Sequence, residues 1–464
     1  MHGLLYTSAV LSCAIRAFAF KDTNQSEALG KLDARLNARD DWNILHHLGG
    51  TGPYVRLPLG GAFAVGDPPE GCKIEQVHMD VLSKIKEKVD DLDSLPLGLE
   101  FISRWADLED QYKIAKLIRG DGEYAATNTI PLWGELLKDK YSHLVRPRTK
   151  MWYSARRKRV QETAELFATA FRGRSLSKEF DIVKDPQDGA NTLGPIETCR
   201  KWKTDSSDTR RIHEEFSKQY GKRIRERLQG TYAKFPWSDF SSLEIQLLQR
   251  LCPLRIMTTG SINNDWCDLF TREEWESYEY ARDLNHYYKI GPGNPKSINL
   301  GFPWIKSTTE LLRSEPSKGT LFFSFSQDSL LIPVVGALNL FSQPGHLPPD
   351  GPPRDWNFRS SRLFPMGARL VIERLNCEGV LYVRIYLNEG YVSVPGCDET
   401  PGRGCPMQKF VDHVEDIGRA AGNWNVKCGT QDEPEEMEFL YKTYSDFDES
   451  ESASASEEAT SDGS

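Results

Sequence analysis

Cysteine is the residue type whose number and spacing say most about the chemistry of this sequence. The 464-residue chain has nine cysteines, of which Cys13 lies in a short apolar run near the N-terminus. The remaining eight are an even number, which in an exported chain predicts four disulfides. They include no C-x-x-C pair, so we do not expect a zinc site. The eight are Cys72, Cys199, Cys252, Cys267, Cys377, Cys397, Cys405 and Cys428.

A glycine-rich stretch is the second feature with chemical potential, because backbone N–H groups in such a loop can cradle a phosphate. It reads GGTGP at residues 49–53 and lacks the lysine and the flanking helix of a P-loop. We therefore predict a surface loop within a turn-rich segment from Trp42 to Pro58. The neighbouring His47 is interpreted as a structural residue.

The N-terminus is typical of an exported protein. The apolar run from Leu4 to Ile15 is too short to span a membrane. The tripeptide AFA at residues 17–19 has small residues where signal peptidase requires them, so we predict a signal peptide at residues 1–19. The alternative is an N-terminal core helix, since no Lys or Arg precedes the run. We expect a secreted, extracellular protein with one glycosylation sequon, at Asn24, and no later membrane span.

Negative charge is concentrated at the C-terminus. The chain has 58 Lys+Arg and 67 Asp+Glu, a formal charge of −9, but Asp446 to Ser464 contain seven acids and no base. Without those seven charges the body carries −2, which does not favour nucleic acid as a partner. Residues 433–464 are acidic and then rich in Ser, Ala and Glu, which predicts a disordered tail. The oligomeric state stays open.

The elements that must position a site begin with a helical block. Residues from about Leu97 to Leu251 predict mainly helix, and Thr163–Arg172 place their apolar side chains on one helical face. Thr271 and Glu274 have the spacing of a capping box, which predicts a helix from there to about Tyr288. The GPGNP sequence at residues 291–295 is expected to end this helix.

Strand segments flank the helical block. Alternating or wholly apolar residues predict strands at 72–79, 321–326, 369–375, 381–387 and 391–394, with the 321–326 strand central and buried. A charged helical pattern occupies Asp80 to Asp93, and a turn is predicted at residues 388–390. This order predicts an α/β domain, residues 20–100 and 265–432, that contains a helical insertion at residues 101–264.

Several short stretches in a fixed order carry a family resemblance over nearly all of the chain from Trp42 to Cys428. They are HHLGGTGPY at 46–54, CKIEQVHM at 72–79, RVQETAELFATAF at 159–171, ANTLGPIETC at 190–199, LFTREEWESYEYARDL at 269–284, GPGNP at 291–295, FSFSQDS at 323–329, PMGARLVIERL at 365–375 and the pair of Cys397 and Cys405. Together they resemble the fungal histidine acid phosphatases, the branch that contains secreted phytases.

The resemblance implies a phosphoglycerate-mutase-like fold, in which a three-layer α/β/α sheet domain holds an inserted, mostly α-helical domain. It implies phosphomonoester hydrolysis at acidic pH without a metal or another cofactor. It also implies how the cysteines pair. The implied disulfides are Cys72–Cys377, Cys199–Cys428, Cys252–Cys267 and Cys397–Cys405.

The family's reaction needs a histidine nucleophile, arginines that hold the phosphate oxygens, and an acid that protonates the leaving alkoxide. In the family an R-H-G-x-R-x-P motif after the first strand supplies the nucleophile and two arginines, and a later His-Asp pair completes the site. By resemblance, Arg159 is a phosphate-binding residue and Asp328 is the equivalent of the general acid. The alternative for Arg159 is a solvated helix start within the basic run at residues 156–159.

The sequence departs from the family at the catalytic residues themselves. Met79 is followed directly by Asp80 where the R-H-G-x-R-x-P motif is expected, and no histidine after His2 precedes a glycine. Gln327 stands where the family has the histidine of its His-Asp pair, and an amide donates hydrogen bonds but carries no charge. His78 is the nearest other candidate nucleophile, but it lacks flanking arginines.

These departures favour a secreted protein that is a phosphomonoester hydrolase by ancestry and has lost most or all of its catalysis. Such a pseudophosphatase would bind a phosphomonoester, an inositol-phosphate-like ligand or another protein. A second hypothesis is an active acid phosphatase or phytase that acts through phosphohistidine and whose motif-encoding exon is missing from the sequence. A third is a phosphatase fold that serves as an accessory protein of a biosynthetic pathway.

Overall fold

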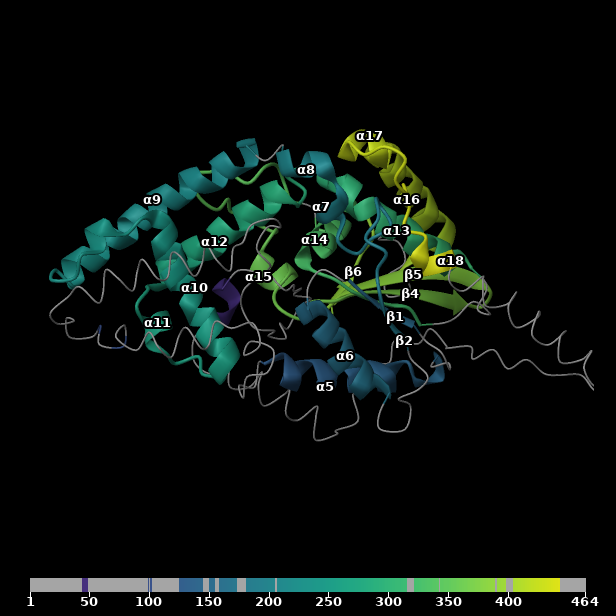
Figure 1. The fold of residues 1–464 in the computed structure, drawn as a ribbon, viewed down its shortest axis with the longest axis horizontal. Coiled ribbons are helices and arrows are strands. Elements are labelled where there is room, and N and C mark those ends of the chain that lie inside the picture. Colours follow the sequence, from purple (N-terminus) through teal and green to yellow (C-terminus); the bar gives the residue numbers. More distant parts are fainter. Residues whose placement is uncertain are drawn as a thin grey trace, which may run out of the picture.

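The computed structural model describes residues 44–48, 99, 101, 125–144, 150–154, 158–172, 181–204, 207–314, 321–341, 343–388, 390–397 and 404–442. Within these residues, strands lie between helices on both of their faces, and a group of long helices lies to one side (Figure 1). The protein therefore has the α/β fold class that the sequence predicts.

A parallel three-stranded sheet forms the part of the fold that matters most for the site. Its strands are β1 (Lys150–Tyr153), β2 (Asp181–Lys184) and β3 (Phe323–Phe325), in the order β2-β1-β3. Tyr153 is paired with Phe325 in register. The neighbouring strands β1 and β3 therefore end at the same edge of the sheet.

Two of these strands lie inside the predicted helical insertion. β1 and β2 fall inside residues 101–264, which the sequence predicts to be a helical insertion, yet β1 pairs with both β2 and β3. Each of the two is only four residues long, which is too short for a periodic pattern to emerge from a helical context. The parallel sheet thus extends into the region that was expected to be helical.

Helix α6 (Lys158–Arg172) covers one face of this sheet, and its apolar face lies where the sequence predicts it. Phe167 contacts the rings of Phe323 and Phe325, at centroid distances of 5.4 and 5.3 Å. β3 itself is shorter and less buried than predicted, since Ser324 is exposed between the two half-buried phenylalanines. The pleat explains this difference, because successive side chains of a strand point to opposite faces.

Further helices complete the layers on either side of the strands (Figure 1). Helix α5 (Ala126–Lys140) packs against α6 on one face. Helices α13 (Ser297–Arg313), α14 (Asp328–Ala337) and α16 (Met407–Ala421) pack together on the other. Strands between two helical layers are the arrangement that the resemblance implies.

A second, antiparallel sheet contains the predicted hairpin. It consists of β4 (Leu370–Cys377), β5 (Val380–Leu387), β6 (Gly390–Val392) and the short β7 (Cys405–Pro406). Asn388, in the predicted turn, has a φ of 59°, a left-handed conformation that asparagine tolerates. The three strand predictions in this region are confirmed, with ends that differ by a few residues.

The group of long helices consists of α9 (Ser207–Thr231), α10 (Ser242–Thr259) and α12 (Arg272–Lys289), and the short α11 (Asp265–Asp268) lies between α10 and α12 in the chain. The predicted capping box at Thr271 and Glu274 is present and starts α12. Ser241 and Glu244 start α10 in the same way. Local sequence therefore determines where both helices begin, because a capping box satisfies N–H groups that the helix itself leaves without acceptors.

Short elements and disulfides connect these parts. The structure has disulfides at Cys199–Cys428, Cys252–Cys267 and Cys397–Cys405, three of the pairs that the resemblance implies. The short elements are η1 (Ile44–His47), η4 (Ser142–Leu144), α7 (Pro195–Thr198), α8 (Arg200–Thr204), η5 (Trp237–Asp239), α15 (Ser360–Leu363), α17 (Trp424–Cys428) and α18 (Phe439–Lys442).

The beginning of the predicted tail needs correction. Residues 433–442 were expected to be disordered, but the structure packs them against the body. Met437, Phe439 and Leu440 are buried, and the carbonyl of Pro434 accepts a hydrogen bond from the Ala190 amide at 2.7 Å. This segment is acidic, but it also contains three large apolar side chains. Their burial against the body stabilises the docked segment.

Several sequence predictions lie outside the described residues. They concern the signal peptide at 1–19, the sequon at Asn24, the strand at 72–79 with His78, the helix at 80–93, the Cys72–Cys377 disulfide and the tail from residue 443 onward. In the part of the chain that the structure describes, none of the helices combines the length and apolar character that a membrane span requires.

Candidate functional site

The residues singled out by resemblance come together at the carboxyl edge of the parallel sheet. Arg159 lies in the first turn of α6, which follows β1 in the chain. Gln327 and Asp328 begin α14, directly after β3. Because neighbouring parallel strands end at one edge, the elements that follow them place these side chains in one region. Arg159 and Asp328 are close enough to influence each other's pKa.

Asp328 is a buried carboxyl group with cations around it. The residue is 4% exposed, and its Oδ2 lies 3.8 Å from Nε2 of His286. Burial raises the pKa of Asp328 to about 7, although Lys289, Arg282 and Arg159 act to lower it. At acidic pH this carboxyl group is therefore protonated and able to donate a proton. Gln327, beside it, is also buried.

Arg159 is half-buried, whereas its neighbour Lys158 is exposed. Burial lowers the pKa of Arg159 to about 10; the Asp328 carboxylate opposes that change and Arg250 adds to it. The guanidinium group still carries its charge at acidic and neutral pH. The burial of Arg159 beside Asp328 favours a position in the candidate site over the alternative of a solvated helix start.

Five residues of this region were not singled out from the sequence. All are basic or titratable. Four of them influence the pKa of Asp328, Arg159 or His286, and His286 itself lies 3.8 Å from Oδ2 of Asp328. Together with Asp328 we call them the charged cluster. They are His213 of α9, Arg250 of α10, and Arg282, His286 and Lys289 of α12.

A signal for three of these residues exists in the sequence. Arg282, His286 and Lys289 follow one another at intervals of four and three positions, so they lie on one face of α12. A charged helical face ordinarily indicates contact with solvent. Here α12 packs against α9 and α10, and His286 is only 4% exposed. The sequence therefore indicates that these three residues share a face of α12, but it does not indicate that this face is buried.

Burial, and then the neighbouring cations, favour the neutral form of both histidines of the cluster. Burial lowers the pKa of His286 well below its usual value, and Arg282, Lys289, His213 and Arg250 lower it further. Nη2 of Arg282 lies 3.5 Å from its Nε2. Burial also lowers the pKa of His213 to about 4, with Arg282 and Lys289 acting in the same direction. Neutral imidazoles beside fixed cations can take up protons when an anion arrives.

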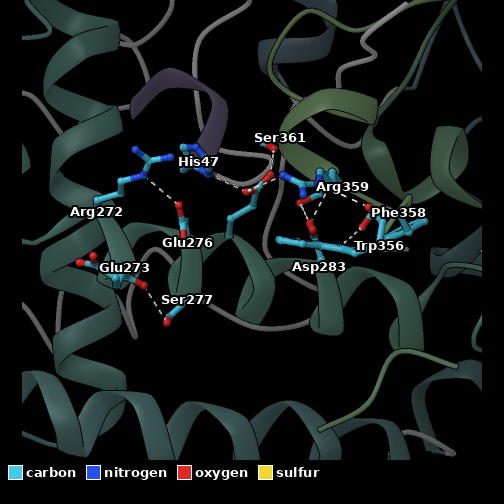
Figure 2. A network of polar contacts seen from close by, with 12 residues as sticks. His47, Arg272, Glu273, Glu276, Ser277, Asp283, Trp356, Phe358, Arg359 and Ser361 are labelled. Carbon is cyan, nitrogen blue, oxygen red and sulfur yellow. Dashed lines mark hydrogen bonds and ion pairs between the residues drawn. The ribbon is translucent and has the colours of Figure 1, made fainter. Parts of the chain in front are cut away.

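A second buried network on α12 is centred on Glu279 and is drawn in Figure 2. Glu279 is fully buried, and its Oε2 lies 2.8 Å from Nδ1 of His47. Ser361 donates a hydrogen bond to the same carboxylate, and Nη1 of Arg359 lies 3.7 Å from it. His47 thus connects η1 to α12, which agrees with its interpretation as a structural residue.

Asp283 extends this network toward α15. Its Oδ1 accepts hydrogen bonds from the backbone amide of Ser360, at 2.6 Å, and from the Ser360 hydroxyl. Burial raises the pKa of Asp283 well above its usual value, with the neighbouring Glu279 adding to the effect. Hydrogen bonds and an ion pair join these polar groups inside the core, so we assign them to the scaffold.

The charged cluster is suited to holding an anion. Arginine and lysine side chains at fixed positions are the groups that proteins use for phosphate oxygens, and a protonated carboxyl group does not repel them. Among the described residues, no three His, Cys, Asp or Glu side chains are grouped so that they could hold a metal ion. The arginine, lysine and carboxyl groups of the cluster suit anion binding and proton donation.

Comparison with known proteins identifies the family of this chain. Residues 112–388 match the sequence model of the histidine phosphatase superfamily (branch 2). The chain belongs to this superfamily. The matched range includes Arg159, Gln327 and Asp328, together with the five additional residues of the charged cluster.

The curated relatives are fungal. Phytase PHO112 of Candida albicans is 29% identical over 427 residues, which cover 86% of this chain and 90% of the relative. Acid phosphatase PHO1 of Komagataella pastoris is 28% identical over 423 residues, 84% of this chain and 87% of the relative. These relatives support a phosphoric monoester hydrolase ancestry.

A solved structure agrees with the fold. The crystal structure of the phytase from D. castellii superimposes with a TM-score of 0.73 and covers 88% of this chain and 94% of its own. The two sequences are 22% identical, so the likeness concerns the fold. The α/β architecture predicted from the resemblance is confirmed.

Proposed function

We propose that this protein is a secreted, phytase-like member of the superfamily that binds a phosphorylated ligand and has lost most or all hydrolysis. The observation that carries the proposal is the absence of R-H-G-x-R-x-P between Met79 and Asp80, together with Gln327 in place of histidine. Because family residues are missing at two separate places in the sequence, a single deletion does not explain both losses. The first loss removes the nucleophile, and the second removes another imidazole from the phosphate.

The expected effect on rate is large. Removing a covalent nucleophile from a catalytic unit reduces the rate by on the order of 10⁶, judged from hydrolases of another class. Two phosphate-binding arginines are absent with the same motif. Arg159, Arg250, Arg282 and Lys289 keep positive charge at the sheet edge, which supports binding without turnover. The ligand class that fits is a phosphomonoester or an inositol-phosphate-like polyanion.

Secretion is the second half of the proposal. The apolar run followed by AFA at residues 17–19 supports export, and three disulfides suit an oxidising compartment. Sequencing the N-terminus of protein recovered from culture medium tests this part. A chain that begins at Phe20 is the expected result, and retention of the protein inside the cell would contradict secretion.

The catalytic half is tested by turnover and binding in one preparation. p-Nitrophenyl phosphate and phytate at about pH 5 are expected to be hydrolysed at no more than a trace of the rate of an active phytase. Phosphate or vanadate is expected to raise the melting temperature. Turnover equal to that of the active enzyme would contradict the loss of catalysis, and no shift with either anion would contradict ligand binding.

An active enzyme is the second candidate, and one observation favours it. Asp328 has a pKa of about 7, so it is protonated at acidic pH as a general acid must be. Under this alternative, a short exon that encodes the R-H-G-x-R-x-P motif is missing from the sequence. Sequencing the transcript decides between the two. Adjacent codons for Met79 and Asp80 eliminate the alternative, and an insertion between them would establish it.

A further inference from the structure

The charged cluster contains two imidazoles that the family-derived assignments do not use. His286 lies on α12 between Arg282 and Lys289, one turn from each. Its Nε2 faces Oδ2 of Asp328 at 3.8 Å and Nη2 of Arg282 at 3.5 Å. His286 thus has one carboxyl group beside it, and the cations around it oppose its charged form.

The groups that act on His286 come from every helix around it. Arg282 and Lys289 belong to its own helix, His213 to α9 and Arg250 to α10, and all four disfavour its charged form. Asp328, from α14, is the carboxyl group that faces it. His213 is held by Ser217, whose hydroxyl lies 3.3 Å from its Nε2. The same two cations, Arg282 and Lys289, act on His213.

We propose that Arg282, His286 and Lys289 of α12, with His213 of α9, form an anion subsite that takes up a proton when a phosphate group binds. The proposal rests on the proposed function, since it assumes that the charged cluster holds a phosphorylated ligand. It adds a subsite on the helical side of the cluster, next to Asp328 and made of residues that the resemblance does not assign. It also makes acidity a condition for tight binding.

Binding of an anion changes the charges around His286, and this change is the physical reason for the proton uptake. Without an anion, charging His286 adds a positive group to a buried set of positive groups, and the imidazole stays neutral. A phosphate dianion bound near Arg282 and Lys289 adds negative charge and an acceptor for the imidazole N–H. The pKa of His286 then rises, and binding and protonation favour each other.

Asp328 acts in the same direction. Below about pH 7 its carboxyl group is neutral and does not repel an anion, and above that pH its charge opposes the ligand. When binding takes up one proton, the affinity rises about tenfold for each unit by which the pH falls. This holds within the pH range where the group titrates. Substitution of Asp328 and of His286 separates the two contributions.

Binding of inorganic sulfate by the full chain is the direct test, because sulfate stays a dianion from pH 4 to pH 8. Calorimetry in two buffers with different ionisation heats counts the protons taken up. We expect proton uptake and an affinity that rises at least about tenfold from pH 7 to pH 5. The same titrations with Asp328→Asn should retain part of this dependence.

Three variants locate the effect. His286→Gln should reduce proton uptake and flatten the pH dependence, because a neutral amide replaces the titrating group. Lys289→Gln should weaken sulfate binding at every pH and keep proton uptake, because the histidine remains. His143→Gln, at an exposed histidine of η4, should behave like the unaltered protein.

The outcomes separate this inference from the proposed function. Sulfate binding without proton uptake by the unaltered protein, or His286→Gln with an unchanged pH dependence, overturns the inference alone. No binding of sulfate, phosphate or phytate at any pH overturns the inference and the proposed function together. The proton count on the unaltered chain keeps the test decisive even if a substituted chain does not fold.

Discussion

At the scale of the residue, two neighbouring positions define what this protein retains. The resemblance assigns Asp328 the position of the family's proton donor, and it places Gln327 where the family has an imidazole. Burial and cations then set the behaviour of Asp328, whose pKa lies near 7. At acidic pH the Asp328 carboxyl group can therefore donate a proton. The role of Asp328 should therefore be tested by titration of its carboxyl group as well as by turnover.

Asp328→Asn should change how stability depends on pH. The folded-state pKa of Asp328, about 7, lies above its usual value of 3.8. The native state therefore binds this proton more tightly, and its contribution to stability is complete below about pH 4 and is lost as the pH rises to 7. The difference between the two proteins can reach about 4 kcal/mol. Urea unfolding at pH 4, 5.5 and 7 measures it.

The Asp328→Asn result has a simple control. Asp412→Asn, at an exposed position of α16, should leave the slope of stability against pH unchanged. The free energy of unfolding of the unaltered protein should fall relative to that of Asp328→Asn between pH 4 and 7. A relative rise over that range would show that the sign of the pKa shift is wrong.

His47→Ala should destabilise the protein without any effect on anion binding. The substitution removes the imidazole that lies 2.8 Å from Oε2 of the fully buried Glu279. Leaving part of a buried carboxylate without its partner costs about 1–3 kcal/mol. Thermal unfolding measures the loss, with the exposed His143→Ala as the neutral comparison. Equal melting temperatures for the two variants would refute the structural role of His47.

At the scale of the element, the close packing of α5 against α6 stabilises the helical layer on one face of the parallel sheet. A Cβ atom added to Gly134 of α5 would lie 2.8 Å from the carbonyl oxygen of Phe167 and 2.9 Å from the amide nitrogen of Phe171, both in α6. Backbone atoms cannot move aside as a side chain can. The absence of a side chain at this position therefore sets the distance between α5 and α6, and through α6 the position of Arg159.

Gly134→Ala should cost about 1–3 kcal/mol through overpacking between α5 and α6. Gly230→Ala is the matched control, because a Cβ atom at that position of α9 meets nothing within 4 Å. Alanine there should be neutral or add up to about 1 kcal/mol, since it favours helix more than glycine does. Chemical denaturation of both variants tests the pair, and a stabilising Gly134→Ala would refute the close packing of these helices.

At the scale of the whole molecule, residues far apart in the chain close the structure. The Cys199–Cys428 disulfide links positions 229 residues apart, and the segment that follows it docks beside β1, where the Phe439 ring lies 4.6 Å from that of Trp152. Lys306 of α13 pairs with Glu436 at 2.5 Å. The C-terminal segment up to Lys442 is therefore part of the body of the protein.

Truncation tests where the body ends. A chain that ends at Asp432 loses the buried side chains of Met437, Phe439 and Leu440 and should lose of the order of 5 kcal/mol of stability. A chain that ends at Lys442 should retain full stability if the acidic remainder is a disordered tail, as the sequence predicts. Melting temperatures of the two truncated chains provide the measurement. Equal values would contradict the docking of residues 433–442.

The sequence by itself determined features that depend on neighbours within a few residues. The capping box at Thr271, the apolar face of α6 and the hairpin of β4 and β5 are of this kind, because caps, helical periodicity and turns are local. The resemblance added Arg159, Asp328 and the cysteine pairs.

Only the tertiary structure decided which distant residues share an environment. It joined β1 and β2 to β3, docked residues 433–442, and brought His213, Arg250 and the charged face of α12 to Asp328. These placements depend on how helices and strands pack over hundreds of residues. Packing also sets the burial that shifts each pKa, and local sequence carries no record of that burial.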